Sequence, residues 1–177
     1  MRPLAAFDRR YLVSLTGVVV GTVLAWGSLA LLWPESTGSS ELLVTAPDRL
    51  AVAAALLVWP ALLVLAMVFT VALTRLATAA FDPLKDRESG FQQRAQRALT
   101  NTVEQTAVFV PALLSAAALA DADGMRFAGV MTGLFCAARL LFWAGYTIAP
   151  LYRAPGMVMT LNINVGVVAY AVYRALQ

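Results

Sequence analysis

The sequence predicts an all-α integral membrane protein, folded as a bundle of about five transmembrane helices. Of its 177 residues, 60% are apolar and only 13% are charged, and the mean hydropathy is +0.75. Soluble domains contain about 45–50% apolar and about 25% charged residues. Long segments also lack Asp, Glu, Lys and Arg, and a helix needs about 20 apolar residues to cross a hydrocarbon core of about 30 Å. These two observations exclude an ordinary soluble domain.

Five segments are long enough to cross a membrane. The third is polar and basic at its start, and it becomes apolar only from Thr106 onward. The fourth spans a membrane only if Arg139 lies inside it. The expected helices cover residues 11–33, 49–74, about 91–120, 126–149 and 156–174.

The chain divides into two parts at the start of the second helix. Residues 1–48 hold a short polar leader, the first transmembrane helix and a loop rich in Pro, Ser, Thr and Gly. Residues 49–177 hold the other four helices.

The basic residues predict an orientation in the membrane. Nine of them fall on one side of the five expected crossings, whereas Arg49, Arg126 and Arg174 fall on the other. Cytoplasmic segments carry the excess of Lys and Arg, so we expect a cytoplasmic N-terminus and a C-terminus on the opposite side. Nucleic acid is not an expected partner, since the basic residues form no run interleaved with aromatic residues. The nine are Arg2, Arg9, Arg10, Arg75, Lys85, Arg87, Arg94, Arg97 and Arg153.

Several classes of chemistry are excluded by residues that the sequence lacks. The chain has no His and one Cys, Cys136. A catalytic triad with His, an imidazole-ligated haem or zinc, and an internal disulfide are therefore impossible. We expect no metal site, and we interpret Cys136 as a small packing residue.

One face of the third expected helix carries an unusual set of polar side chains. Arg94, Arg97, Asn101 and Glu104 follow one another at offsets that place them within an arc of roughly 80°. In the fourth helix, Arg139 lies near mid-span among apolar residues. A charge at this depth needs a partner, so we expect Glu104 to pair with Arg139.

Two interpretations of these polar residues stay open. Polar side chains in transmembrane helices often only hold helices together. Arginines outnumber carboxylates here, however, and a surplus of fixed positive charge favours an anionic guest such as a carboxylate or phosphate. In the last helix, Asn162 and Asn164 point about 200° apart, so they cannot serve one site. We expect them to make hydrogen bonds between helices, and lining a substrate cleft is the alternative.

At these residues the chain resembles the MAPEG family, the membrane-associated proteins of eicosanoid and glutathione metabolism. The resemblance runs over about residues 49–176 and leaves the first helix as an addition to a four-helix subunit. It rests on three pieces that lie on successive helices: Arg75 with Phe81, the pattern Arg97, Asn101 and Glu104, and Arg139 with Tyr146.

The resemblance implies a homotrimer that binds glutathione between subunits near the cytoplasmic side. Arg97, Asn101 and Glu104 would bind the polar ends of glutathione from one subunit. The site would be completed, partly from the neighbouring subunit, by Arg75, Arg139 and Tyr146.

The resemblance also implies a transferase or peroxidase that uses glutathione as co-substrate and takes its hydrophobic small-molecule substrate from the membrane lipids. Arg153 would activate the glutathione thiol, and its alternative role is that of a positive anchor at the membrane surface. The chain departs from the family's enzymes at Leu99, where these often carry His, and at Thr102, where an acidic residue is common. A non-catalytic membrane scaffold or lipid-binding protein is therefore the alternative function.

Overall fold

The computed structural model describes residues 9–32, 45–79, 88–121 and 124–177. Over these ranges the chain forms helices only, and five spans are long and apolar enough to cross a membrane, as predicted. Residues 1–8 of the leader, most of the first loop, Phe81, Lys85, Arg87 and Asp123 lie outside the described residues, whereas Arg9 and Arg10 already belong to the first helix. The helices are α1 (Arg9–Leu32), α2 (Ala46–Leu56), α3 (Val58–Thr78), α4 (Gly90–Leu119), α5 (Met125–Ile148), the short 3-10 helix η2 (Pro150–Arg153) and α6 (Ala154–Ala175).

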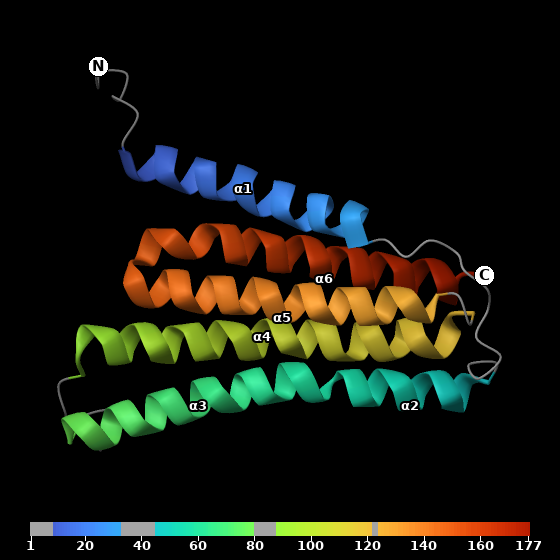
Figure 1. Ribbon diagram of the computed structural model, residues 1–177, viewed down its shortest axis with the longest axis horizontal. Coiled ribbons are helices and arrows are strands. Elements are labelled where there is room, and N and C mark those ends of the chain that lie inside the picture. Colours follow the sequence, from blue (N-terminus) through green and yellow to red (C-terminus); the bar gives the residue numbers. More distant parts are fainter. Residues whose placement is uncertain (1–8, 33–44, 80–87, 122–123) are drawn as a thin grey trace.

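The five spans run side by side. Across the bundle in Figure 1 they follow in the order α1, α6, α5 and α4, and the last span consists of α2 and α3 end to end. Helix α6 packs against α1, α4 and α5, and α4 also packs against α2 and α3. Helix α1 thus joins the bundle through α6, at the edge opposite to α2 and α3.

The second span differs from the single helix that the sequence predicts. It is interrupted at Leu57, where α2 ends and α3 begins. Pro60 explains the interruption because a proline lacks the N–H group that would bond to the carbonyl four residues earlier, and its ring pushes that carbonyl away. The affected carbonyl belongs to Leu56, the last residue of α2.

Two arginine side chains cap the C-terminal end of α4. At the end of α4, Arg49 of α2 donates to the carbonyl oxygens of Ala117 and Ala118 at 3.1 and 3.2 Å, and Arg174 of α6 donates to that of Leu119 at 3.0 Å. The last carbonyls of a helix have no partner within it and carry a partial negative charge. These arginine side chains therefore provide hydrogen-bond donors for the last carbonyls of α4.

The two asparagines of α6 make the predicted hydrogen bonds between helices, and each one reaches a different neighbour. Asn162 accepts a hydrogen bond of 3.2 Å from the indole of Trp26 on α1. Asn164 donates to the carbonyl and the side-chain oxygen of Gln105 on α4, at 3.2 and 2.9 Å.

Close approach of α6 to α5 depends on Gly156. This residue is buried, and a Cβ atom there would lie 2.7 Å from the carbonyl oxygen of Ala138 and closer still to the backbone of Phe142. Gly166, further along α6, has open space at the same position.

We therefore expect Gly156→Ala to destabilise the bundle by about 1–3 kcal/mol, the usual cost of forcing extra atoms into a packed core. Gly166→Ala is the matched control and should leave stability unchanged or slightly raised, because alanine is the better helix former. Thermal unfolding of the two variants in detergent measures the difference. Equal unfolding temperatures would show that α5 and α6 are not in close backbone contact.

Candidate functional site

A layer of polar side chains crosses the centre of the bundle where α4, α5 and α6 meet. Arg139 of α5 is 0% exposed. Its guanidinium donates to the Thr102 hydroxyl at 2.7 Å, to the Asn101 side-chain oxygen at 3.1 Å and to the Thr160 hydroxyl at 3.5 Å. We call Asn101, Thr102, Arg139 and Thr160 the polar layer.

The polar layer separates two apolar clusters of the core. On one side lie Phe109 of α4 and Phe135 of α5, whose stacked rings are 4.2 Å apart between centroids. On the other side lie Met67, Ala98, Phe142 and Tyr146. Arg139 therefore occupies a point that is surrounded by hydrocarbon along the bundle in both directions.

The two threonines are oriented to accept hydrogen bonds from Arg139. The Thr102 hydroxyl donates a hydrogen bond of 2.8 Å to the Ala98 carbonyl, and the Thr160 hydroxyl donates one of 2.7 Å to the Gly156 carbonyl. Each hydroxyl oxygen therefore turns its lone pairs toward the guanidinium. The guanidinium carbon also lies 4.0 Å from the ring centroid of Phe142, within cation–π range.

Among the described residues, no carboxylate touches the buried guanidinium, and the expected direct pair of Glu104 with Arg139 is wrong. The Asn101 amide lies between the two groups. Its oxygen accepts from Arg139, and its nitrogen donates to the Glu104 carboxylate at 3.5 Å. Because the acceptors of Arg139 are neutral, its positive charge is not compensated by direct contact.

The polar face of α4 divides into two edges. On the edge toward α5, Arg94 donates to the Thr147 carbonyl at 3.2 Å and Asn101 meets Arg139. Arg94 thus caps the end of α5. On the other edge, Arg97 and Glu104 are exposed on the surface of the chain. Arg97 makes no hydrogen bond or ion pair with any described residue.

Tyr146 and Arg153 form a second group at the end of the bundle where α5 passes into η2. Tyr146 is buried, and its ring packs against that of Phe142. The guanidinium carbon of Arg153 lies 5.0 Å from the Tyr146 ring centroid. Arg153 itself is exposed. Tyr146 shares an apolar cluster with Ala98 of α4, the residue that follows Arg97 in the sequence.

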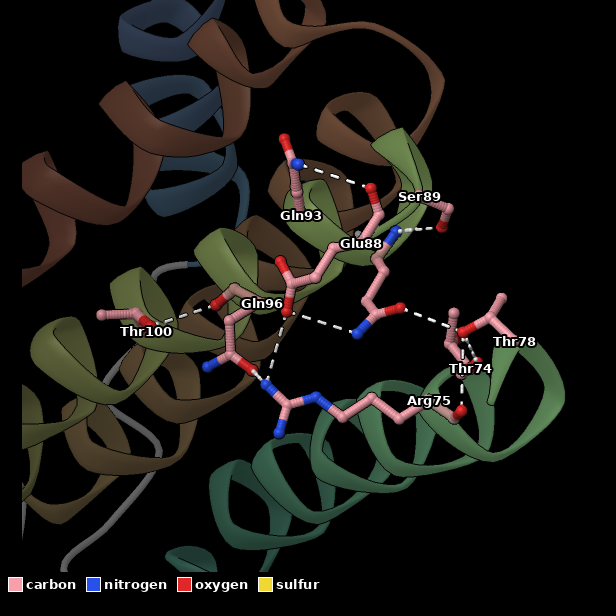
Figure 2. A network of polar contacts seen from close by, with 9 residues as sticks. Thr74, Arg75, Thr78, Glu88, Ser89, Gln93, Gln96 and Thr100 are labelled. Carbon is pink, nitrogen blue, oxygen red and sulfur yellow. Dashed lines mark hydrogen bonds and ion pairs between the residues drawn. The ribbon is translucent and has the colours of Figure 1, made fainter. Parts of the chain in front are cut away.

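Arg75 belongs to a third group, at the junction of α3 and α4. Figure 2 shows its side chain reaching from α3 to the start of α4, where it lies 3.6 Å from the Glu88 carboxylate and donates to Gln96 at 3.4 Å. Gln92 is fully buried beside them and bonds to both Thr78 and Glu88. Arg75 therefore links the two helices directly.

A groove on the surface of α3 and α4 begins at this junction. It encloses about 480 Å³ and is lined by Arg75, Gln96 and apolar side chains that include Val71 and Leu99. The described residues hold no group of three or more His, Cys, Asp or Glu side chains that could bind a metal ion.

Sequence reasoning missed the roles of Thr102 and Thr160. Thr102 was noted only as a departure from the family's pattern, although it makes the shortest hydrogen bond to Arg139. The sequence did contain a pattern that could have predicted the contact between Thr160 and Arg139. Arg139 and Thr160 lie at equal distances along the chain from the turn at Ala149 and Pro150, so two antiparallel helices place them at the same depth.

The chain matches the model of one protein family. No curated protein matches it. The family model covers residues 50–173, which hold nearly all of the four spans that follow α1 and leave α1 itself outside the match. These residues include the polar layer, both edges of α4, and the Arg75 and Arg153 groups. A match over so much of the chain shows that this membrane protein belongs to the MAPEG family.

Proposed function

We propose that this protein is a glutathione-dependent transferase or peroxidase that acts on hydrophobic electrophiles or lipid hydroperoxides. The observation that carries the proposal is the outer edge of α4, where Arg97 and Glu104 are exposed beside Asn101. Family membership supports the same reading, because the MAPEG family acts in eicosanoid and glutathione metabolism.

The charges of this edge are complementary to those of glutathione. The tripeptide carries two carboxylates and one ammonium group. Arg97 offers a guanidinium that can bind a carboxylate through two hydrogen bonds, and Glu104 can accept from the ammonium group. The Asn101 amide between them suits the peptide groups of the ligand, and Arg139 fixes the orientation of that amide.

Arg153 is the proposed activator of the glutathione thiol. An ordinary thiol has a pKa of about 8.5, and a neighbouring guanidinium lowers it by stabilising the thiolate, which is the nucleophile. In a transferase, the thiolate sulfur bonds to the electrophilic carbon of the second substrate, and the bond from that carbon to the leaving group breaks, so that the leaving group departs with the electron pair. In a peroxidase, the thiolate attacks the terminal oxygen of the hydroperoxide, the O–O bond breaks, and the alkoxide takes a proton and leaves as the alcohol. A second glutathione then attacks the resulting sulfenic acid and gives glutathione disulfide and water.

The proposed active form is a homotrimer. Arg97 and Glu104 lie well inside α4, where lipid would be their neighbour if the subunit stood alone, and charged side chains in lipid cost several kcal/mol. A second copy against this edge of α4 removes that cost. It also places the site between subunits, where Arg75 can contribute directly, while the enclosed Arg139 contributes through the Asn101 amide that it orients.

A non-catalytic membrane scaffold or lipid-binding protein is the second candidate. It is favoured by the internal contacts of two proposed site residues, because Arg75 pairs with Glu88 and Arg139 is fully enclosed by the bundle. In that case the same charges hold helices together and no thiol is activated.

Glutathione binding separates the two candidates. The parent protein in detergent should bind glutathione and give the ultraviolet absorbance of a thiolate. Glu104→Gln should weaken binding about tenfold or more, since a hydrogen bond to a charged group contributes about 1.5–3 kcal/mol. Arg153→Gln should keep binding but lose the thiolate absorbance. Calorimetry and spectroscopy measure these two properties.

Two variants serve as controls for that experiment. Ser115→Ala changes an exposed residue further along α4 and should have no effect. Arg153→Lys keeps the positive charge and should keep part of the thiolate signal. Absence of binding at millimolar glutathione would end the proposal, whereas binding without a thiolate signal in the parent would favour the non-catalytic protein.

The proposed orientation has the N-terminus in the cytoplasm and the C-terminus outside. It rests on the excess of basic residues at the end of the bundle that holds Arg75, Arg94 and Arg153. A fluorescent protein that matures only in the cytoplasm should therefore be bright when fused to the N-terminus and dark when fused after Gln177. The reverse pattern would invert the topology and place the Arg153 group on the outer side.

A further inference from the structure

The turn that carries Arg153 has no side chain of its own in the core. None of the four residues of η2 is buried, and Leu151, Tyr152 and Arg153 are exposed. The Tyr152 amide donates to the Ala149 carbonyl at 3.0 Å, a bond that closes the turn but does not attach it to the bundle. The position of η2 therefore depends on contacts that neighbouring helices make with its backbone.

Helix α5 makes one such contact. A Cβ atom on Gly145 would overlap the Tyr152 carbonyl oxygen and would lie 3.3 Å from the Arg153 backbone nitrogen, so the backbones of α5 and η2 touch directly. The next residue of α5 is Tyr146, whose ring centroid lies 5.0 Å from the Arg153 guanidinium carbon. Helix α5 therefore supports η2 on the side of the proposed thiol site.

Helix α1 makes the second contact, immediately after Arg153. A Cβ atom on Gly17 would lie 2.5 Å from Ala154 Cβ, and one on Gly21 would lie 2.9 Å from Val158 Cβ. Both glycines are buried, and they lie four residues apart on one face of α1. A side chain at either position would force α1 away from the start of α6. Because Ala154 follows Arg153 directly, the position of α1 limits where the turn can lie.

The rest of α1 is held along α6. Ala25 continues the buried face of α1, and the indole of Trp26 donates to the Asn162 side-chain oxygen at 3.2 Å. Figure 1 shows α1 lying along α6, with its first turns at the end of the bundle where α5 passes into α6. Gly27, by contrast, has open space where a Cβ atom would lie. Helix α1 is therefore a fixed neighbour of the turn.

We propose that α1 positions Arg153 for activation of the glutathione thiol, through the contact of Gly17 with Ala154. This inference rests on the proposed function, in which the Arg153 guanidinium stabilises the thiolate. The attraction between two charges falls as the distance between them grows, so a displaced turn gives less stabilisation. Gly17 has no side chain that could touch a ligand, and its role is that of a positioning residue.

The positioning role belongs to this chain rather than to the matched family region. Helix α1 ends at Leu32, before residues 50–173 of the family match begin, whereas Arg153 and Ala154 lie inside that match. An element outside the matched region thus touches the residue next to the proposed thiol activator.

Hydrogen exchange in the absence of glutathione tests whether α1 holds the turn. The double variant carries Gly17→Ala and Gly21→Ala, and Gly27→Ala is the matched control on the same helix. Alanine is the better helix former, so these variants keep α1 helical. In detergent, the amides of residues 149–156 should exchange about tenfold faster in the double variant, because extra atoms at a close contact favour local opening. The control should exchange like the parent.

Glutathione then tests the consequence for the thiol. At neutral pH, the thiolate absorbance of bound glutathione should fall about threefold in the double variant, and the pH of half-ionisation should rise accordingly. The affinity for glutathione should change less than about twofold, because the proposed binding residues on α4 are untouched. Equal losses of affinity and absorbance would show a general loss of structure and would contradict a positioning role.

Unchanged exchange of residues 149–156 in the folded double variant would overturn the inference, and so would unchanged thiolate absorbance beside faster exchange. If the double variant does not fold, Gly17→Ala alone makes the contact with Ala154 too close and leaves that with Val158 in place. It should show the same changes to a smaller degree. A parent protein that binds no glutathione contradicts the proposed function instead, and the exchange result still decides whether α1 holds the turn.

Discussion

The burial of one guanidinium governs the centre of this bundle. Arg139 is fully enclosed at mid-span, and the groups that receive its hydrogen bonds are two hydroxyls and an amide rather than a carboxylate. Removing a cation from water costs several kcal/mol, which is offset only by well-placed partners. Those partners come from α4 and α6, so satisfying Arg139 fixes three helices at one depth. Gly156 supports this arrangement in two ways. It lets α6 approach α5 closely, and its carbonyl accepts a hydrogen bond from the Thr160 hydroxyl.

The arrangement of the candidate site follows from that constraint. Because the Asn101 side-chain oxygen accepts from Arg139, its nitrogen is directed toward Glu104, and the carboxylate stays at the surface of the bundle. Arg97 lies on the same outer edge without an internal partner among the described residues, while Arg94 is used to cap α5. Of the four polar side chains on this face of α4, two therefore hold the bundle together and two remain exposed, where a ligand or a second copy of the chain could reach them.

Sequence reasoning predicted the elements well and the contacts less well, for physical reasons. Charge-free segments revealed the five spans, and the 200° separation of Asn162 and Asn164 correctly indicated that they do not serve one site. Helical periodicity gives the direction of a side chain but not which neighbour it reaches, so Arg139 was paired with Glu104 instead of Asn101 and Thr102. The break at Leu57 was not predicted, because a proline within a transmembrane span is often tolerated without interrupting the helix. Arg97 and Glu104 lie on α4 whereas Arg153 lies in η2, so the periodicity of one helix does not show whether they meet one ligand.

A double-mutant cycle on glutathione affinity tests the role of Arg139 most directly. Arg139→Met replaces the buried cation with an apolar side chain, a change that bundles often tolerate, and Asn101→Ala removes the amide that it orients. If Arg139 acts through Asn101, each variant should weaken binding about tenfold, and the double variant should be no weaker than either one. Losses that multiply in the double variant, with all proteins folded, would show that the two residues act independently and would contradict this account.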